Sequence, residues 1–273
     1  MTINRDDEAY TRDVASRISR MTLEGKAPWL KDHPAGAAEV SYYPFIDPAP
    51  IYDGVNAVLL DLVAAERGFK DPRWIPMAMV ESHKLTPKYG EKPVCLAFRN
   101  RFVEVTDTNP ISGTVASALS DSAKRISYYY VYNAEQIRGM PPLQKDRDTT
   151  LVKMKTENAL KNTGAKRTSE LLQSFSRQLP SHNCDAQETL AAIAKYRLAC
   201  QLRLPYKADV NLEKARREVQ KRDRESLLRA AYYAANDASI ATNPGKALVV
   251  EPRRTIQRDP ELSHTRSSRG IER

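Results

Sequence analysis

Apolar side chains recur every three or four residues near the start of the chain, a spacing that is typical of an amphipathic α-helix. This spacing predicts a helix over residues 6–25, with several arginines lying off its apolar side. Its apolar positions are Tyr10, Val14, Ile18 and Met21. The stretch from there to residue 50 is rich in Pro, Gly and Ala without a regular period, so we expect a long loop.

The next segment, residues 51–74, combines a turn with an apolar run. Gly54 is expected to adopt a positive φ in the turn, because glycine reaches that conformation without steric cost. The run VLLDLV predicts a helix from Asn56 to Arg67, with the Asn56 side chain as its cap. Gly68 is then expected to end the helix.

Two runs rich in apolar and aromatic residues predict β-strands. They are VCLAF, which continues to residue 105, and ISYYYVY at residues 126–132. Residues 106–125 between them are mostly polar and predict an irregular excursion, so the two strands are expected to pair antiparallel. With a short helix over residues 77–83, these elements predict an α+β fold with a small, mainly antiparallel sheet and packed helices.

The second half has a helical pattern, with a possible short strand only at residues 247–250. Helices are predicted over residues 151–162, 169–179, 186–202 and 210–238. Asp185 is expected to cap the third of them, with Glu188 in the N3 position of a capping box.

These patterns divide the chain into three parts. Residues 1–142 form the predicted α+β domain, and residues 143–242 form a basic, mainly helical region. Residues 243–273 are rich in Pro, Ser and Arg with little to bury, so we expect a disordered tail.

Charge is distributed unevenly along the 273 residues. The net charge is +9, yet residues 1–143 carry 17 Lys and Arg against 18 Asp and Glu. The positive excess therefore belongs to the second half, which makes a polyanionic partner plausible.

The cysteine content and the N-terminus indicate a cellular compartment. Cys95, Cys184 and Cys200 are an odd number in scattered positions, which is typical of reduced thiols. The sequence begins MTINRDDEAY without an apolar leader segment, and no run is long enough to cross a membrane. We therefore expect a cytoplasmic protein without a membrane partner.

Motifs for the common catalytic and metal-binding chemistries do not occur in the sequence. The four histidines form no HExxH pair, and GxxxxGK[ST], GxGxxG and GxSxG are absent. No two carboxylates stand in an arrangement that marks a catalytic pair. We therefore expect no catalytic residues, no metal and no cofactor.

A nucleic-acid interface has better support, because the first half places aromatic and basic residues near loops. Single-strand binders combine such basic surfaces with aromatic rings on which bases stack. The alternative for each Trp or Tyr taken alone is an ordinary core position with its polar tip bonded, and for each lysine a solvated surface position.

Five short motifs stand in a fixed order along the first half. They are Ala27-Pro28-Trp29, Tyr52-x-Gly54-x-Asn56, Gly68-Phe69 with Pro72-Arg73-Trp74, Lys88-x-Gly90-Glu91-Lys92, and Tyr130-Val131-Tyr132-Asn133-Ala134-Glu135-Gln136-Ile137. In this order they resemble the N-terminal domain of the ArdC antirestriction family over roughly residues 6–142.

The resemblance implies single-stranded DNA binding, in proteins of conjugative plasmids and related mobile elements that act in antirestriction or assist DNA transfer or replication. It implies stacking by aromatic side chains, phosphate contacts by cations, and a base contact or a fixed turn at Asn56. The implied nucleic-acid-binding residues are Trp29, Tyr52, Gly54, Asn56, Arg73, Trp74, Lys88 and Lys92.

The sequence also departs from the family. A zinc metallopeptidase-like domain with HExxH often follows the N-terminal domain in the family, and here a basic helical extension takes its place. The family's second tryptophan shortly after Trp29 is missing, and Ser82-His83 replaces a usual glycine pair.

Two hypotheses stay open for the helical half. It can supply non-specific attraction to phosphates. Alternatively, the chain is a protein-interaction module that binds a restriction enzyme or a partner from the transfer machinery through these helices, whose charges are then a solvated face.

Overall fold

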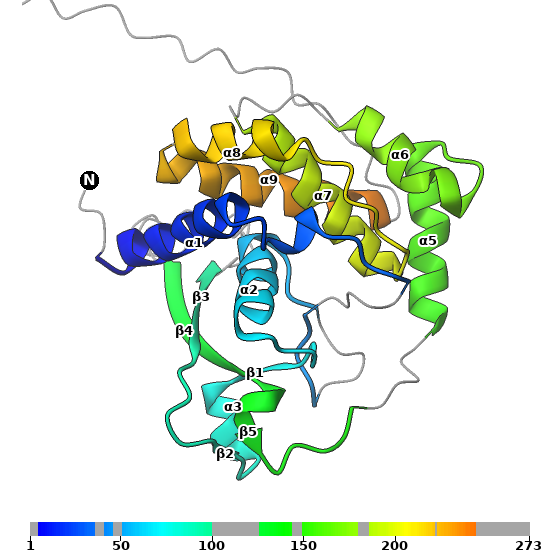
Figure 1. Cartoon of the computed structure of the whole chain (residues 1–273). Coiled ribbons are helices and arrows are strands. Elements are labelled where there is room, and N and C mark those ends of the chain that lie inside the picture. The colour runs from blue at the N-terminus through cyan, green and yellow to red at the C-terminus, as the bar shows by residue number, and fades with distance from the viewer. Residues whose placement is uncertain are drawn as a thin grey trace, which may run out of the picture.

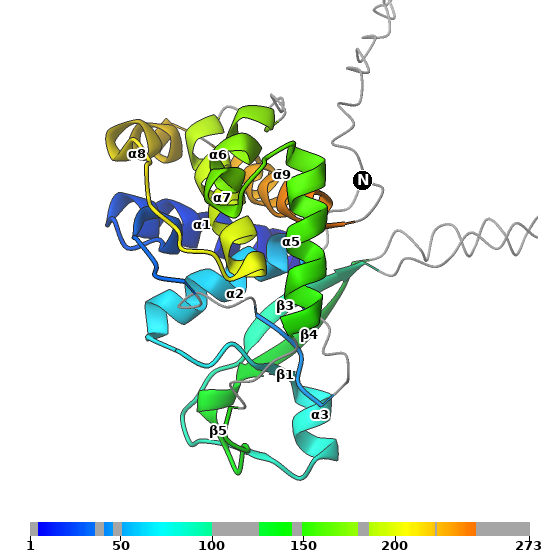
Figure 2. The same cartoon turned by 90° about the vertical axis from the view of Figure 1, so that its right-hand side faces the viewer.

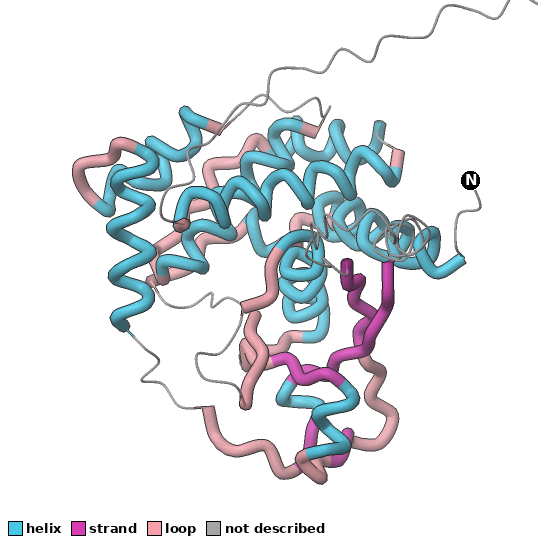
Figure 3. The backbone as a smooth tube through the Cα atoms, turned by 180° about the vertical axis from the view of Figure 1, so that it is seen from behind, coloured by secondary structure: helices cyan, strands magenta, loops and turns pink. Residues whose placement is uncertain are grey.

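The computed structural model describes residues 5–35, 41–45, 51–99, 126–143, 149–179, 186–221 and 223–243. A layer of helices lies above a smaller lobe that contains the strands, as Figure 1 and the side view of Figure 2 show. Seen from behind in Figure 3, the strands again gather at the end away from most of the helices.

The predicted helical content of both halves is confirmed. The helices before residue 142 are α1 (Arg5–Leu23), η1 (Pro28–Leu30), α2 (Gly54–Arg67), α3 (Met77–Ser82) and η2 (Ala134–Gln136). Those after it are α5 (Thr149–Thr163), α6 (Thr168–Gln178), α7 (Gln187–Leu202), α8 (Leu212–Lys221) and α9 (Arg224–Thr242).

The predicted antiparallel sheet is also confirmed. It consists of β1 (Trp74–Pro76), β3 (Val94–Arg99) and β4 (Ile126–Asn133), in the order β1-β4-β3. A second, two-stranded antiparallel sheet pairs β2 (Thr86–Pro87) with β5 (Ile137–Arg138). In the larger sheet Leu96 lies opposite Tyr129 and Val94 opposite Val131, and these four side chains belong to or pack against the core.

One apolar core includes residues from both sides of residue 142. Val14 and Leu60 of α1 and α2 lie in the same buried cluster as Phe175, Ile193 and Ala234 of α6, α7 and α9. Buried apolar area is the main stabilising contribution to a fold. The α+β part and the helical part therefore depend on each other for burial.

A buried ion pair also joins the two parts. Arg197 of α7 donates from Nη1 to Asp61 Oδ2 of α2 at 2.8 Å, and both side chains are almost fully buried. Burial raises the pKa of Asp61, and the facing guanidinium partly offsets that rise. Removing either partner would leave an uncompensated buried charge, which is strongly unfavourable.

The first helix after the long loop begins two residues earlier than predicted. Asp53, and not Asn56, is the N-cap of α2, and its Oδ1 accepts a hydrogen bond from the Gly54 backbone N–H at 2.7 Å. Gly54 has φ of +62° as expected, and Gly68 ends the helix in the left-handed conformation. The prediction of Asn56 as the cap was wrong, because its side chain instead bonds to the backbone of Ala97 in β3.

The predicted long helix over residues 210–238 is in fact two helices, α8 and α9. Asp223 begins α9 as its N-cap, accepting a hydrogen bond from the Ser226 backbone N–H at 2.7 Å. The apolar spacing alone does not distinguish one bent segment from two helices. The buried side chains of α8 are those of Ala215 and Val219. This helix packs against α1 and α7, whereas α9 packs against α7, α1, α2 and α5.

Several predictions fall on residues outside those that the structure describes. These are the continuation of the first strand to residue 105, the excursion over residues 106–125, the short strand at residues 247–250 and the tail from residue 244 onward. The predicted capping box at the start of α7 is wrong, because Ala186 is the N-cap and makes no side-chain hydrogen bond there. The Glu188 carboxylate instead accepts from the Asn211 N–H at 3.1 Å and from Lys214 Nζ at 3.0 Å. Among the described helices, none is long and apolar enough to cross a membrane.

Candidate nucleic-acid interface

The aromatic residues expected to stack on bases lie in the core. Trp29 and Trp74 expose 1% and 0% of their surface, and Tyr52 exposes 9%. The Tyr52 hydroxyl donates to the Trp74 carbonyl oxygen at 3.0 Å, and burial raises the pKa of Tyr52. Phe69 packs edge-to-face on Trp74. Because these rings are covered, the described structure offers no open face for a base at Trp29, Tyr52 or Trp74.

Arg73 is likewise buried, and its guanidinium is hydrogen-bonded within the protein. Its Nη2 donates to Asp71 Oδ2 at 2.7 Å, and its Nη1 donates to the Pro141 carbonyl oxygen at 2.8 Å. The hydrogen bonds that Arg73 donates to Asp71 raise the pKa of Arg73, and the residue is 7% exposed. The guanidinium therefore joins β1 to the segment after β5, and its charge already has a partner.

Asn56 completes the edge of the sheet. Its Nδ2 donates to the Ala97 carbonyl oxygen at 2.7 Å, and its Oδ1 accepts from the Ala97 N–H at 3.1 Å. The Tyr10 hydroxyl donates to the same Oδ1 at 2.8 Å. The amide thus satisfies both backbone groups of a residue in β3, which has no further strand on that side among the described residues. Gly54 therefore begins α2, and Asn56 joins this helix to β3.

Lys88 and Lys92, the two remaining predicted residues, are exposed and lie together on the turn between β2 and β3. The buried side chain of Gln136 holds this turn, because its Nε2 donates to Glu91 Oε2 at 2.8 Å and to the Lys92 carbonyl oxygen at 3.1 Å. The Lys88 N–H also donates to the Gln136 carbonyl oxygen at 2.8 Å. The turn is therefore anchored at both ends.

Tyr89 stands at the tip of the anchored turn. Its side chain is 101% exposed, whereas most tyrosines of the described residues are buried or half-buried. Gly90 follows with φ of +80° and lets the chain reverse direction there. Sequence reasoning missed Tyr89 as a site residue. The available signal was an aromatic residue in the polar turn Thr86–Lys92, with no apolar neighbour to pack against.

Five exposed cations lie on the turn that carries Tyr89 or on segments joined to it, and we call them the basic strip: Arg67, Lys84, Lys88, Lys92 and Arg138. Arg67 Nη1 donates to the Lys92 carbonyl oxygen at 2.7 Å, which places the end of α2 beside the turn. Thr86 pairs with Arg138 across β2 and β5, which places Arg138 close to both Lys84 and Lys88. The strands β2 and β5 lie at the lower end of the molecule in Figure 1.

The charges of the basic strip are not neutralised by ion pairs within the described part of the chain. Lys88 Nζ donates to the neutral Glu135 carbonyl oxygen at 2.6 Å. The nearby carboxylates of Glu135 and Glu91 accept other hydrogen bonds, Glu135 from the Lys70 and Asp71 N–H groups and Glu91 from Gln136. The strip can therefore offer several unpaired cations to an external anion.

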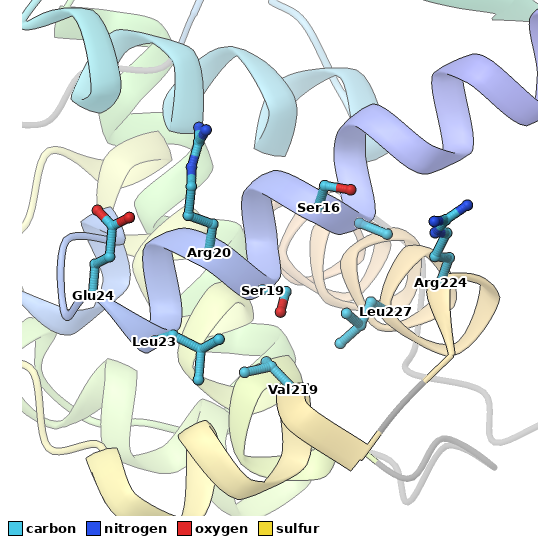
Figure 4. Close-up of a pocket in the computed structure, with 9 residues that line it drawn as sticks. Ser16, Ser19, Arg20, Leu23, Glu24, Val219, Arg224 and Leu227 are labelled. Carbon is cyan, nitrogen blue, oxygen red and sulfur yellow. The ribbon is translucent and has the colours of Figure 1, made fainter.

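A cavity of about 450 Å³ lies between α1, α8 and α9. In Figure 4, Ser19, Leu23, Val219 and Leu227 point toward one another, while Arg20 points away toward α2. Arg20 there forms an ion pair with Glu66. The cavity is thus mainly apolar, and its chemistry does not select a ligand class.

The described residues do not suit a metal ion either. They contain no group of three or more His, Cys, Asp or Glu side chains that could hold one. We therefore derive no chemistry through a metal.

Comparison with known proteins identifies relatives of this arrangement. Residues 8–134 match the family model described as the N-terminal domain of anti-restriction factor ArdC. Two DNA primases TraC from Escherichia coli are each 29% identical, over 167 and 164 residues. These matches cover 57% and 56% of the chain but only 15% and 11% of the primases. The chain thus spans a small part of their length.

Two solved structures of the antirestriction ArdC protein from plasmid R388 share the fold. The metal-free structure has a TM-score of 0.54 at 18% identity, and the Mn(II)-bound structure has 0.56 at 17%. Each match covers 85% of this chain and 96% of the other. A match of that extent reaches beyond residue 142, so the similarity of fold includes the helical half.

Proposed function

Because residues 8–134 belong to the family of ArdC N-terminal domains, we propose that the chain binds single-stranded DNA without catalysing a reaction, through the basic strip and Tyr89. The observation that carries this proposal is the anchored turn Lys88–Lys92, which holds a fully exposed ring between cations that have no ion-pair partner among the described residues. In the wider setting, the protein serves a conjugative plasmid or related mobile element, in antirestriction or as an accessory to DNA transfer or replication.

The preference for a single strand follows from the geometry of the turn. An exposed ring at the tip of a turn can stack on an unpaired base, whereas the bases of a duplex are already stacked and paired. Each stack of this kind contributes about 1–3 kcal/mol. The five cations supply attraction to the backbone that does not depend on sequence.

The salt dependence of binding tests the proposal. Fluorescence anisotropy of the 273-residue chain with a labelled oligothymidylate should show log K falling with log salt at a slope of about −2 to −3.5, for three to five phosphate contacts at about 0.7 each. A duplex of the same length should bind more weakly. Equal binding of both would contradict the stacking role of Tyr89.

Charge placement is tested by a matched pair of variants. The double change Lys84→Gln with Arg138→Gln should weaken binding and lower the salt slope by about 1.4. The control, Lys161→Gln with Lys166→Gln, removes the same charge from exposed positions on and after α5 and should leave the slope nearly unchanged. If the unmodified chain does not bind single strands even at low salt, the alternative of a protein-interaction module is favoured instead.

A further inference from the structure

A second aromatic surface lies near the basic strip, on residues that the proposed site does not use. The rings of Phe45 and His83 stack with centroids 4.3 Å apart and an angle of 19° between their planes. Phe45 is 40% exposed, and His83 is exposed as well. Each ring presents one face to the other, so the pair forms a flat aromatic surface that meets solvent.

Both rings of this pair are held in place. His83 Nδ1 lies 3.0 Å from the Met79 carbonyl oxygen and 3.1 Å from Ser82 Oγ, and these contacts hold the imidazole against α3. The segment that carries Phe45 is joined to β1, because the Trp74 N–H donates to the Tyr42 carbonyl oxygen at 2.9 Å.

The backbone around the pair is unusual. Phe45 has φ of +71° and Lys84, which follows His83, has φ of +54°. Residues other than glycine seldom adopt this conformation, and a bulky aromatic residue does so least readily. Full apolar burial does not explain it for Phe45, because 40% of the residue is exposed. Outliers of this kind cluster at functional sites.

The pair also lies within reach of the strip. Tyr89 lies six positions after His83, so their Cα atoms are at most about 22 Å apart. Lys84, Lys88 and Arg138 belong to the same stretch or to β5 beside it. Stacked nucleotides in one strand advance by about 3.4 Å each, so at most roughly six nucleotides cover this distance.

We propose that the Phe45–His83 pair is a second base-stacking platform, and that one DNA strand contacts both this pair and Tyr89 across the basic strip, within a span of up to about six nucleotides. The proposal rests on the proposed function, because it assigns a second contact to the same ligand. An isolated nucleotide or trinucleotide occupies one platform at a time, whereas a longer strand occupies both.

Oligonucleotide length tests this inference. Anisotropy titrations of the full chain with labelled dT3 and dT12 compare the parent, Phe45→Leu and Phe45→Tyr. Phe45→Leu keeps an apolar side chain but removes the π-face, so the Kd for dT12 should rise about five-fold or more. Phe45→Tyr keeps the ring and should bind like the parent. For dT3 the rise should stay within about two-fold, because Tyr89 remains available.

A second variant tests whether the loss comes from the stacked pair and not from a local disturbance of the backbone at Phe45. His83→Ala removes the ring that supports Phe45 and should reproduce the loss for dT12. If Phe45→Leu and His83→Ala bind dT12 like the parent while Tyr89→Ala weakens it, the second platform is wrong and the proposed site stands. If no protein binds dT12 at low salt, the proposed function fails and the platform fails with it.

Discussion

The Ile51–Trp74 segment and the basic strip contain the same kinds of residue and use them differently. Trp74 is fully buried and Arg73 bonds to a carboxylate and a carbonyl oxygen. Tyr89 is fully exposed, and the cations beside it have no ion-pair partner in the described part of the chain. Both regions thus contain the same residue types. Whether a side chain can contact a ligand depends on its burial and on whether it already bonds to other groups of the protein.

The two regions are nevertheless connected, because the packed one positions the exposed one. Arg67 at the end of α2 bonds to the Lys92 carbonyl oxygen, and the Glu135 carboxylate accepts from the Lys70 and Asp71 N–H groups. Lys88 in turn bonds to the Glu135 carbonyl oxygen. The Ile51–Trp74 segment therefore serves as a frame that fixes the turn on which Tyr89 stands.

The largest expected effect comes from removing the helices that cover this frame. A chain that ends at Pro142 loses the partners of residues such as Val14, Ile18, Leu59 and Leu60, each 0% exposed. Each fully buried side chain of this size contributes about 1.5–3 kcal/mol, so four of them approach the 5–15 kcal/mol of a typical domain. We expect no cooperative unfolding transition of this fragment in urea, followed by circular dichroism.

A sigmoidal urea transition of the fragment would contradict the mutual dependence of the two halves. In that case residues 1–142 would be an independent folding unit, as the sequence pattern suggested, and the ion pair between Asp61 and Arg197 would be dispensable for it.

The next largest effect separates Trp74 from Tyr89. Trp74→Ala should lower the free energy of unfolding by about 3–5 kcal/mol, because it opens a cavity in the core. Tyr89→Ala, on an exposed ring, should change it by no more than about 0.5 kcal/mol. Urea denaturation of both variants measures the difference.

Binding should show the opposite order. Trp74→Phe, which keeps most of the buried volume, should bind dT12 like the parent, whereas Tyr89→Ala should lose about 1–3 kcal/mol of binding free energy. A Trp74→Phe protein that folds but binds dT12 poorly would indicate that Trp74 contacts the DNA.

The secondary structure was largely predictable because it depends on local signals. Gly54 and Gly68 stand where positive φ is needed, and the alternation in Tyr128–Val131 places Tyr129 and Val131 on the core side. The division between α8 and α9 was missed, because Asp223 in a charged segment looks like another solvated residue until its side chain is seen to bond Ser226.

The candidate site was predictable only in part. Lys88 and Lys92 were found because they flank a turn, but an indole such as that of Trp74 looks the same in a sequence whether it stacks on a base or fills a core. Burial depends on distant contacts, because η1, which carries Trp29, packs against α7 more than 150 residues away. The turn that carries Tyr89 is held likewise by the distant side chain of Gln136.

Asn56 offers a test of intermediate size. Asn56→Ala removes both hydrogen bonds to the Ala97 backbone and the acceptor of the Tyr10 hydroxyl. Unsatisfied groups of this kind cost about 1–3 kcal/mol, so the variant should unfold at lower urea concentration. Asn56→Asp keeps the acceptor but not the donor, so its free energy of unfolding should lie between those of the parent and of Asn56→Ala. If Asn56→Ala is as stable as the parent but binds DNA more weakly, the amide contacts the ligand.

The smallest expected effect belongs to Lys92, which has an exposed side chain at one end of the turn. Lys92→Gln should leave the free energy of unfolding within about 0.5 kcal/mol of the parent, because only the Lys92 backbone carbonyl bonds to Gln136 and Arg67. One lost phosphate contact should reduce the salt slope for dT12 by about 0.7. Lys161→Gln is the matched control and should keep the parent slope. Equal slopes for the two variants would mean that the strand does not pass Lys92, and the path of the DNA would then have to run from Tyr89 toward Arg138 alone.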